Sequence, residues 1–194
     1  MKGKIKNALI SVSDKENLKN LLIILRKYKI NIISSGGTYR SIKKLGFKCE
    51  EISEYTGFDE MLDGRVKTLH PKIHSGILFD RKKNSHKKQM KSKNYQAIDL
   101  VIVNFYPFKE ILKKTSNNTK IIENIDIGGP SMVRAAAKNS NDVVIITDKK
   151  DYPNFIKEIK KYKGKTSLTF REKLASKAFG LTAFYDSIIA EWYN

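Results

Sequence analysis

Residues 99–105 read DLVIVNF, an apolar run with three β-branched residues at its centre. An unbroken run of this kind is typical of a strand that is buried on both faces of a parallel sheet. Runs of the same character stand elsewhere in the chain, and a weaker one, FKCEEI, lies at 47–52. We predict the strong strands at 8–12 (ALISV), 30–34 (INIIS), 99–105 and 142–147 (DVVIIT).

Amphipathic stretches separate these apolar runs. The alternation predicts an α/β fold with an open, mostly parallel β-sheet flanked by helices. A basic run, RKKNSHKKQMKSK at 81–93, separates the two halves of the sheet, and we expect it to be a solvated loop or a mobile helix. The helices are expected at 16–28, 38–45, 129–138 and 149–161.

The C-terminal part has a different pattern. Thr169 and Glu172 have the spacing of a capping box, which predicts a helix start. Apolar residues then recur at helical spacing at Leu174, Ala178, Leu181, Phe184, Tyr185, Ile188 and Trp192. This stripe can pack on the sheet, or it can form an arm that pairs with another subunit or a following domain. We therefore expect a single domain over 1–194, with 165–194 as a C-terminal helical arm.

Composition limits the classes of function. The chain has 194 residues, of which 40% are hydrophobic and 30% charged, as in a soluble globular protein. No stretch approaches the roughly 20 apolar residues that cross a bilayer, and the N-terminal apolar run is too short for a secretory signal. The single cysteine, Cys49, is expected to be a buried, inert thiol and fits a reducing cytoplasm. The net charge of +18 raises the question of nucleic-acid binding. Because the basic run contains no aromatic residue for stacking, we favour incidental basicity.

Polar loops follow the first two predicted strands, at the sheet edge where parallel sheets bind ligands. The first loop is SVSDK and the second, SSGGT, leads directly into a helix. Glycine allows close approach of the backbone, and the amides at a helix start attract anions. Each loop alone could serve only to cap a helix, but together they predict a phosphate cradle made of Ser11, Ser13, Lys15, Ser35, Gly36, Gly37 and Thr38.

Three further segments concentrate reactive side chains. DGRVKTLHP (63–71) contains two cations, a hydroxyl and an imidazole, so it is either a polar loop or a loop that binds an anion and does chemistry. NFYPF places Asn104 and Tyr106 at the end of the fourth strong strand, and a nearby cation would favour the phenolate form of the tyrosine. IDIGGPSMVRAAAKN places Asp126 before two glycines and Lys138 in the following helix, although such an aspartate is often only a helix cap.

Metal and nucleotide-loop signatures are weak or missing. His70 and His74 have the spacing of a helical zinc pair, but Pro71 lies between them and no acidic third ligand is suitably spaced. We therefore expect no metal site. The sequence also has neither a triphosphate-binding phosphate loop nor a dinucleotide fingerprint.

Five segments, SVSDK, SGGT, TGFDEMLDGRVKTLHPKIHSGIL, NFYPF and ENIDIGGPSMVRAAAKN, resemble in order and spacing the IMP cyclohydrolase domain. That domain is the N-terminal part of bifunctional purine biosynthesis proteins, whose C-terminal part is AICAR transformylase. The resemblance covers nearly the whole chain and implies the methylglyoxal synthase-like fold. It also implies closure of 5-formamidoimidazole-4-carboxamide ribonucleotide to IMP with loss of water, without cofactor or metal.

The resemblance implies a role for each matched residue. The catalytic residues would be Lys67, Tyr106, Asp126 and Lys138. Lys67 and Tyr106 would form a coupled pair that handles a proton, while Asp126 and Lys138 would orient the carboxamide and formyl groups. Which residue is the general base stays open. The substrate would be bound by the seven cradle residues together with Arg65, Thr68, Asn104 and Gly128.

The resemblance further implies a cytoplasmic homodimer with a nucleotide substrate, and no specific nucleic acid or membrane as a partner. The family's bifunctional protein continues for several hundred residues, so we expect no transformylase activity from this chain. Two other readings share the anion cradle: a methylglyoxal synthase, and a nucleotide-sensing regulatory domain that binds IMP without turnover. A nucleic-acid binder is motivated only by the charge.

Overall fold

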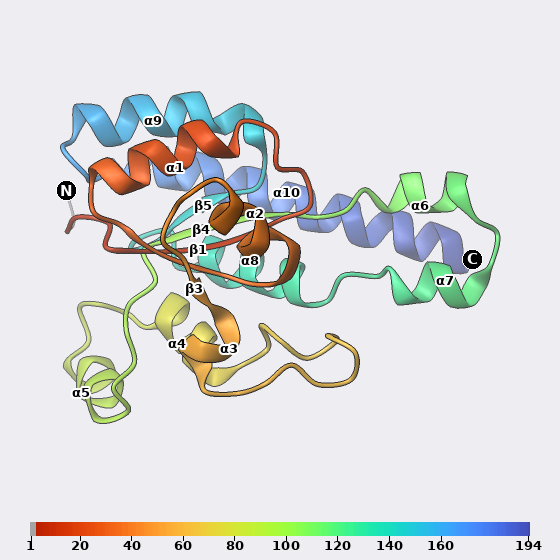
Figure 1. The fold of residues 1–194 in the computed structure, drawn as a ribbon, viewed down its shortest axis with the longest axis horizontal. Helices are drawn as coiled ribbons and strands as arrows, with labels where there is room; N and C mark the ends of the chain where they lie inside the picture. The colour runs from red at the N-terminus through yellow and green to blue at the C-terminus, as the bar shows by residue number, and fades with distance from the viewer. Residues whose placement is uncertain (1–2) are drawn as a thin grey trace.

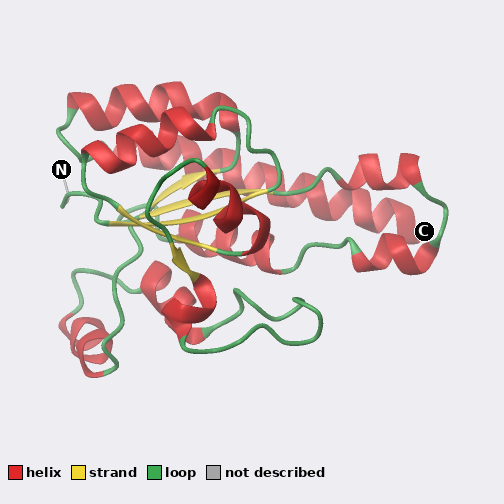
Figure 2. Ribbon diagram, viewed as in Figure 1, coloured by secondary structure: helices red, strands yellow, loops and turns green. Residues whose placement is uncertain are grey.

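A parallel β-sheet forms the centre of the molecule. The computed structural model describes residues 3–194, and these contain a five-stranded sheet with the order β3-β2-β1-β4-β5 and every neighbouring pair parallel. The predicted fold class and strong strands are therefore confirmed (Figure 2). The strands are β1 (Asn7–Val12), β2 (Asn31–Ser34), β3 (Glu50–Glu51), β4 (Leu100–Asn104) and β5 (Val144–Ile146).

The middle of the sheet is the core. Ile10 on β1 and Ile102 on β4 are paired in register, and at most 1% of either side chain is exposed. Burying an isoleucine contributes about 1.5–3 kcal/mol, so β-branched residues on both faces stabilise this strand pair strongly. The register also pairs Val12 with Asn104, which brings the ends of β1 and β4 to one edge.

Helices cover both faces of the sheet (Figure 1). On one face α1 (Leu18–Lys27) contacts α9 (Tyr152–Lys161), which follows the short η1 (Lys149–Asp151). On the other face α8 (Gly128–Lys138) packs against β4, β5 and α10 (Leu168–Tyr193). With α2 (Gly36–Lys44), these elements confirm the predicted helices, although α1 begins two residues later and α2 two residues earlier than predicted.

The structure also contains helices that the periodicity did not predict. Each has at most eight residues, which is too short for an apolar stripe to repeat. They are α3 (Ile52–Thr56), α4 (Pro71–Leu78), α6 (Phe108–Lys114) and α7 (Asn118–Glu123). The strand predicted at 47–52 is reduced to the two residues of β3, and α3 begins directly after it at Ile52. The basic run forms the helix α5 (Asn84–Ser92), which stands apart from the sheet in Figure 1 and buries only Met90.

The C-terminal helix starts two residues before the position that the predicted capping box gives. Ser167 caps it by accepting a hydrogen bond from the Phe170 amide at 3.3 Å, and Glu158 holds Ser167 through bonds of 2.8 and 2.6 Å. The predicted capping box of Thr169 and Glu172 is therefore wrong, because a contact from α9 fixes the start of the helix. Much of the apolar stripe packs inside the molecule, whereas Phe184 is 56% exposed.

The C-terminal half of α10 extends beyond the sheet, beside α6 (Figure 1). Although α10 has 26 residues, neither it nor any other helix within residues 3–194 is long and apolar enough to cross a membrane.

Candidate active site

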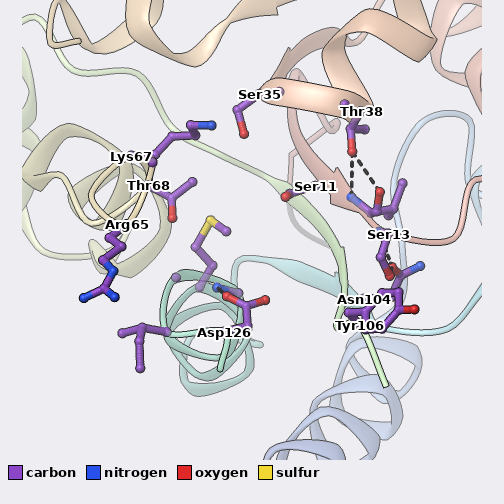
Figure 3. A pocket seen from close by; sticks show the side chains of 18 of the residues that line it. Ser11, Ser13, Ser35, Thr38, Arg65, Lys67, Thr68, Asn104, Tyr106 and Asp126 are labelled. Atoms are coloured by element: carbon purple, nitrogen blue, oxygen red, sulfur yellow. Dashed lines mark hydrogen bonds between the residues drawn. The ribbon is translucent and has the colours of Figure 1, made fainter. Parts of the chain in front are cut away.

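A cavity of about 730 Å³ opens at the carboxyl ends of β1, β2 and β4. Its wall is formed by the loops after these strands, by the segment 63–68 and by the first turns of α2 and α8. Every predicted catalytic and substrate-binding residue lines this cavity except Lys138. Figure 3 shows Lys67 and Thr68 on one side and Ser13, Asn104 and Tyr106 on the other, with Asp126 between them.

Two lysine side chains lie beside the start of α2. Gly36 has a φ of +53°, a left-handed conformation that glycine adopts without strain. A β-carbon at Gly36 would lie 3.6 Å from Lys67 Nζ, and one at Gly37 would lie 3.9 Å from Lys15 Nζ. Both ammonium groups therefore lie beside this first turn, where the helix dipole already favours negative charge.

Two predicted binding residues shape the cradle through their own hydrogen bonds. Thr38 Oγ1 accepts from the Val12 amide at 3.0 Å and donates to the Val12 carbonyl at 2.9 Å. Asn104 Oδ1 accepts from the amide and the hydroxyl of Ser13, at 2.7 and 2.9 Å. Thr38 therefore ties the first turn of α2 to the end of β1, and Asn104 ties the end of β4 to the loop after β1.

Side chains lie close to the two glycines in the first turn of α8. A β-carbon at Gly128 would overlap Thr68 Oγ1, and one at Gly129 would overlap the carboxylate of Asp126. The Asp126 carboxylate accepts a 2.8 Å hydrogen bond from the Gly129 amide, as the cap interpretation predicts. Burial nevertheless raises the pKa of Asp126, and the bond from Gly129 only partly offsets this rise. A carboxylate with a raised pKa in the wall of a cavity is suited to accept a proton.

Lys67 and Tyr106, predicted as a coupled pair, each contact another side chain in this structure. Lys67 Nζ lies 2.5 Å from Glu60 Oε2, and the pKa of Glu60 is lowered by this contact. Tyr106 Oη instead accepts a 2.7 Å hydrogen bond from Lys114 Nζ, which raises the pKa of Lys114.

Arg65 is also paired with a carboxylate, that of Glu123. Glu60, Glu123 and Lys114 were not predicted as part of the site, because nothing in the residue spacing indicates which chain segments meet.

Lys138 lies elsewhere. It is exposed at the end of α8, an 11-residue helix that rises about 1.5 Å per residue, so its backbone is roughly 15 Å from Gly128. It lines a second cavity of about 660 Å³, together with His74, Phe179 and Tyr185. Asp126 lines both cavities, but one chain does not bring Lys138 together with Lys67.

The two histidines have separate roles. His70 is the N-cap of α4, and its Nδ1 accepts a 3.1 Å hydrogen bond from the Lys72 amide. This explains the imidazole of DGRVKTLHP as a helix cap. His74 is half-buried, which lowers its pKa.

Within residues 3–194 there is no cluster of three or more His, Cys, Asp or Glu side chains suited to a metal ion. Cys49 is half-buried rather than buried, and burial raises the pKa of its thiol to about 12, so it is protonated at neutral pH.

Two sequence families match the chain. The MGS-like domain family matches residues 17–131, and the AICARFT/IMPCHase bienzyme family matches residues 136–194. The bifunctional purine biosynthesis protein PurH of Acetivibrio thermocellus is 50% identical over 189 residues, covering 97% of this chain and 37% of the relative. PurH of Bradyrhizobium diazoefficiens is 45% identical over 191 residues, covering 98% of this chain and 36% of the relative.

The chain therefore spans just over a third of the length of these relatives. A solved structure, the crystal structure of ForH, superposes with a TM-score of 0.86 at 32% identity and covers 97% of this chain and 96% of its own.

Proposed function

We propose that this chain is an IMP cyclohydrolase. The premise is that it belongs to the MGS-like domain family and matches the N-terminal part of bifunctional purine biosynthesis proteins. The reaction closes 5-formamidoimidazole-4-carboxamide ribonucleotide to IMP with loss of water. The observation that carries this proposal is one cavity that combines two helix starts and three cationic side chains with a partly buried carboxylate.

The phosphate of the nucleotide would bind at the α2 end of the cavity. Lys15 and Lys67 lie beside the first turn of α2, and Ser35 at its N-cap makes no capping hydrogen bond through its side chain. A helix start with two ammonium groups and the Ser35 hydroxyl beside it suits a phosphate group. Ser11 and Ser13 extend this surface along the end of β1, while Arg65, Thr68 and Gly128 form the opposite wall.

The rest of the cavity suits ring closure. The carboxamide nitrogen attacks a formyl carbon of the same molecule, so holding the reactive rotamer supplies much of the acceleration. The attack needs a proton acceptor for the nitrogen and stabilisation of the charge that develops on the formyl oxygen. We assign proton transfer to Asp126, whose burial raises its pKa, and charge stabilisation to Lys67. Tyr106 would act with Lys114, the cation that it contacts.

Lys138 can join this catalytic set only from a second copy of the chain, because its own copy places it in another cavity. We therefore propose a homodimer in which Lys138 crosses the interface. Lys67→Ala and Lys138→Ala should each be inactive alone, and mixing the two variants after subunit exchange should restore activity. A mixture that stays inactive although exchange is complete would remove Lys138 from the shared site.

The test of function compares two substrates. Purified protein is given the formamido nucleotide with a chelator present, and IMP formation is followed by ultraviolet absorbance. A parallel sample receives dihydroxyacetone phosphate, because the match to MGS-like domains also suits a methylglyoxal synthase. We expect turnover of the nucleotide only. Methylglyoxal formation would favour the synthase, and IMP binding without turnover would favour a regulatory domain.

The proposed setting follows from the same family. The relatives are purine biosynthesis proteins and continue well beyond the matched segment, so an AICAR transformylase domain is the proposed partner in a longer protein. We expect this chain alone to lack transformylase activity, and we expect it in the cytoplasm.

A further inference from the structure

Tyr185, on the C-terminal helix, contacts both segments that carry the proposed catalytic groups. Its side chain is only 5% exposed. The ring lies 5.0 Å from the Phe105 ring and 6.3 Å from the Phe108 ring, measured between centroids. These two phenylalanines flank Tyr106 in the chain. Tyr185 therefore packs directly beneath the segment that presents Tyr106 to the cavity.

The hydroxyl of the same residue holds the other segment. Tyr185 Oη accepts a 2.8 Å hydrogen bond from the backbone amide of Asp126, across 59 positions of sequence. The carboxylate of Asp126 is bonded in turn to the Gly129 amide. Asp126 is thus fixed at two points, its own amide and its carboxylate, and one of them depends on α10.

Packing alone does not require this hydroxyl. Trp192, on the same helix as Tyr185, also packs edge-on to Phe108, with a centroid distance of 6.1 Å. A phenylalanine at position 185 would fill the same space as the tyrosine ring. What phenylalanine cannot do is accept the Asp126 hydrogen bond. A half-buried amide without an acceptor is costly, so the segment before α8 would shift to find another one.

We propose that Tyr185 is a positioning residue that aims the Asp126 carboxylate at the reacting groups through its hydrogen bond to the Asp126 amide. This inference rests on the proposed function, since it concerns the same site. A small displacement of a catalytic group slows the chemical step but changes substrate binding little. We therefore expect the effect in kcat and not in KM.

The experiment is a double-mutant cycle of Tyr185→Phe and Asp126→Asn, with kcat and KM for ring closure. We expect Tyr185→Phe to lower kcat about tenfold with KM nearly unchanged, and to have little further effect when Asp126 is already asparagine. The matched control is Tyr193→Phe on the same helix, where the side chain is 61% exposed and kcat should stay unchanged. Equal effects of Tyr185→Phe in both backgrounds, or an unchanged kcat, would overturn the proposal.

Amide hydrogen exchange provides a test that is independent of turnover. In the wild-type protein the Asp126 amide should exchange at least about tenfold more slowly than an unstructured amide, and Tyr185→Phe should remove most of this protection. An unprotected Asp126 amide in the wild-type protein would overturn the inference even if no variant folds. If the wild-type protein shows this protection but no ring closure, the proposed function fails and the structural link between Tyr185 and Asp126 stands.

Discussion

At the scale of single residues, the cations of the cavity already carry counter-ions. Lys67 is paired with Glu60 and Arg65 with Glu123, and both glutamates are largely exposed. An incoming phosphate group must compete with these carboxylates for the same ammonium and guanidinium groups. Exposed ion pairs are screened by solvent and contribute little to stability, so a ligand can displace these carboxylates.

Replacing Glu60 by glutamine should therefore tighten anion binding. Removing this competing carboxylate predicts a Kd for IMP that is lower by a factor of about 1.5–5 at low salt. Isothermal titration calorimetry measures this directly. The matched control is Glu110→Gln, which breaks the ion pair between Glu110 and Lys113 within α6. Glu110 does not line the cavity, so this change should leave the Kd unchanged. Weaker binding by Glu60→Gln would show that Glu60 supports the ligand site.

The ionised carboxylate of Asp126 is proposed to act in catalysis but lowers the stability of the folded protein. Burial raises its pKa in the folded protein, so the folded state binds the proton more tightly than the unfolded chain does. Stability consequently falls as pH rises from the usual pKa of the group through the raised one, and the ionised carboxylate costs folding free energy at neutral pH.

Asp126→Asn should then fold with a Tm equal to or above that of the wild type at pH 7, while kcat falls about 100-fold. An asparagine oxygen can still accept the hydrogen bond from Gly129. Thermal unfolding at pH 7 and steady-state kinetics provide the two measurements. A variant that melts well below the wild type, or that keeps its kcat, would contradict this account of the residue.

At the scale of elements, strand positions could be predicted because a buried parallel strand needs a local run of β-branched residues, as at 99–105. The helices α2 and α8 were predicted for a similar reason, since glycine and capping residues mark their starts. Short helices such as α6 are stabilised by tertiary packing, so their sequences carry too little local signal. The cap at Ser167 depends on Glu158, which no local pattern reveals.

The site followed the same rule. Fourteen predicted residues converge on one cavity because they follow strands or open helices, positions that a sequence marks. The pairing of charges could not be predicted, because Lys67 meets Glu60 and Tyr106 meets Lys114 only through the path of the loops.

The first turn of α8 makes an element-scale prediction. Gly129→Ala would push the Asp126 carboxylate away, so we expect a loss of about 1–3 kcal/mol in the free energy of unfolding and a marked loss of kcat. Gly180→Ala on α10 is the control, since a β-carbon there meets nothing within 4 Å. Alanine at that helical position should instead add up to about 1 kcal/mol. Urea unfolding of both variants checks the sign of each change, and a neutral Gly129→Ala would be inconsistent with the close contact.

At the scale of the whole molecule, the net charge of +18 is a property of the surface, separate from the cavity. The basic helix α5 stands apart from the sheet (Figure 1), and Lys87, Lys88 and Lys91 on it are exposed. Long-range attraction by such charges acts mainly on association and is screened by salt.

Changing these three lysines to glutamine should leave kcat/KM for ring closure within about twofold of the wild type at 0.15 M salt. The same variant should bind duplex DNA more weakly than the wild type at low salt, without any change in sequence preference. Steady-state kinetics and a fluorescence anisotropy titration measure the two effects. A fall of kcat/KM by about tenfold would mean that α5 takes part in the reaction.

The most direct test of the central claim is the rate of IMP formation from the formamido nucleotide by the wild-type protein and by Lys67→Ala, measured side by side in the presence of a chelator. The account predicts that the wild type converts the substrate completely to IMP and that the variant, still folded, is slower by about 100-fold or more. Equal rates for the two proteins, or no IMP from the folded wild type, would contradict it.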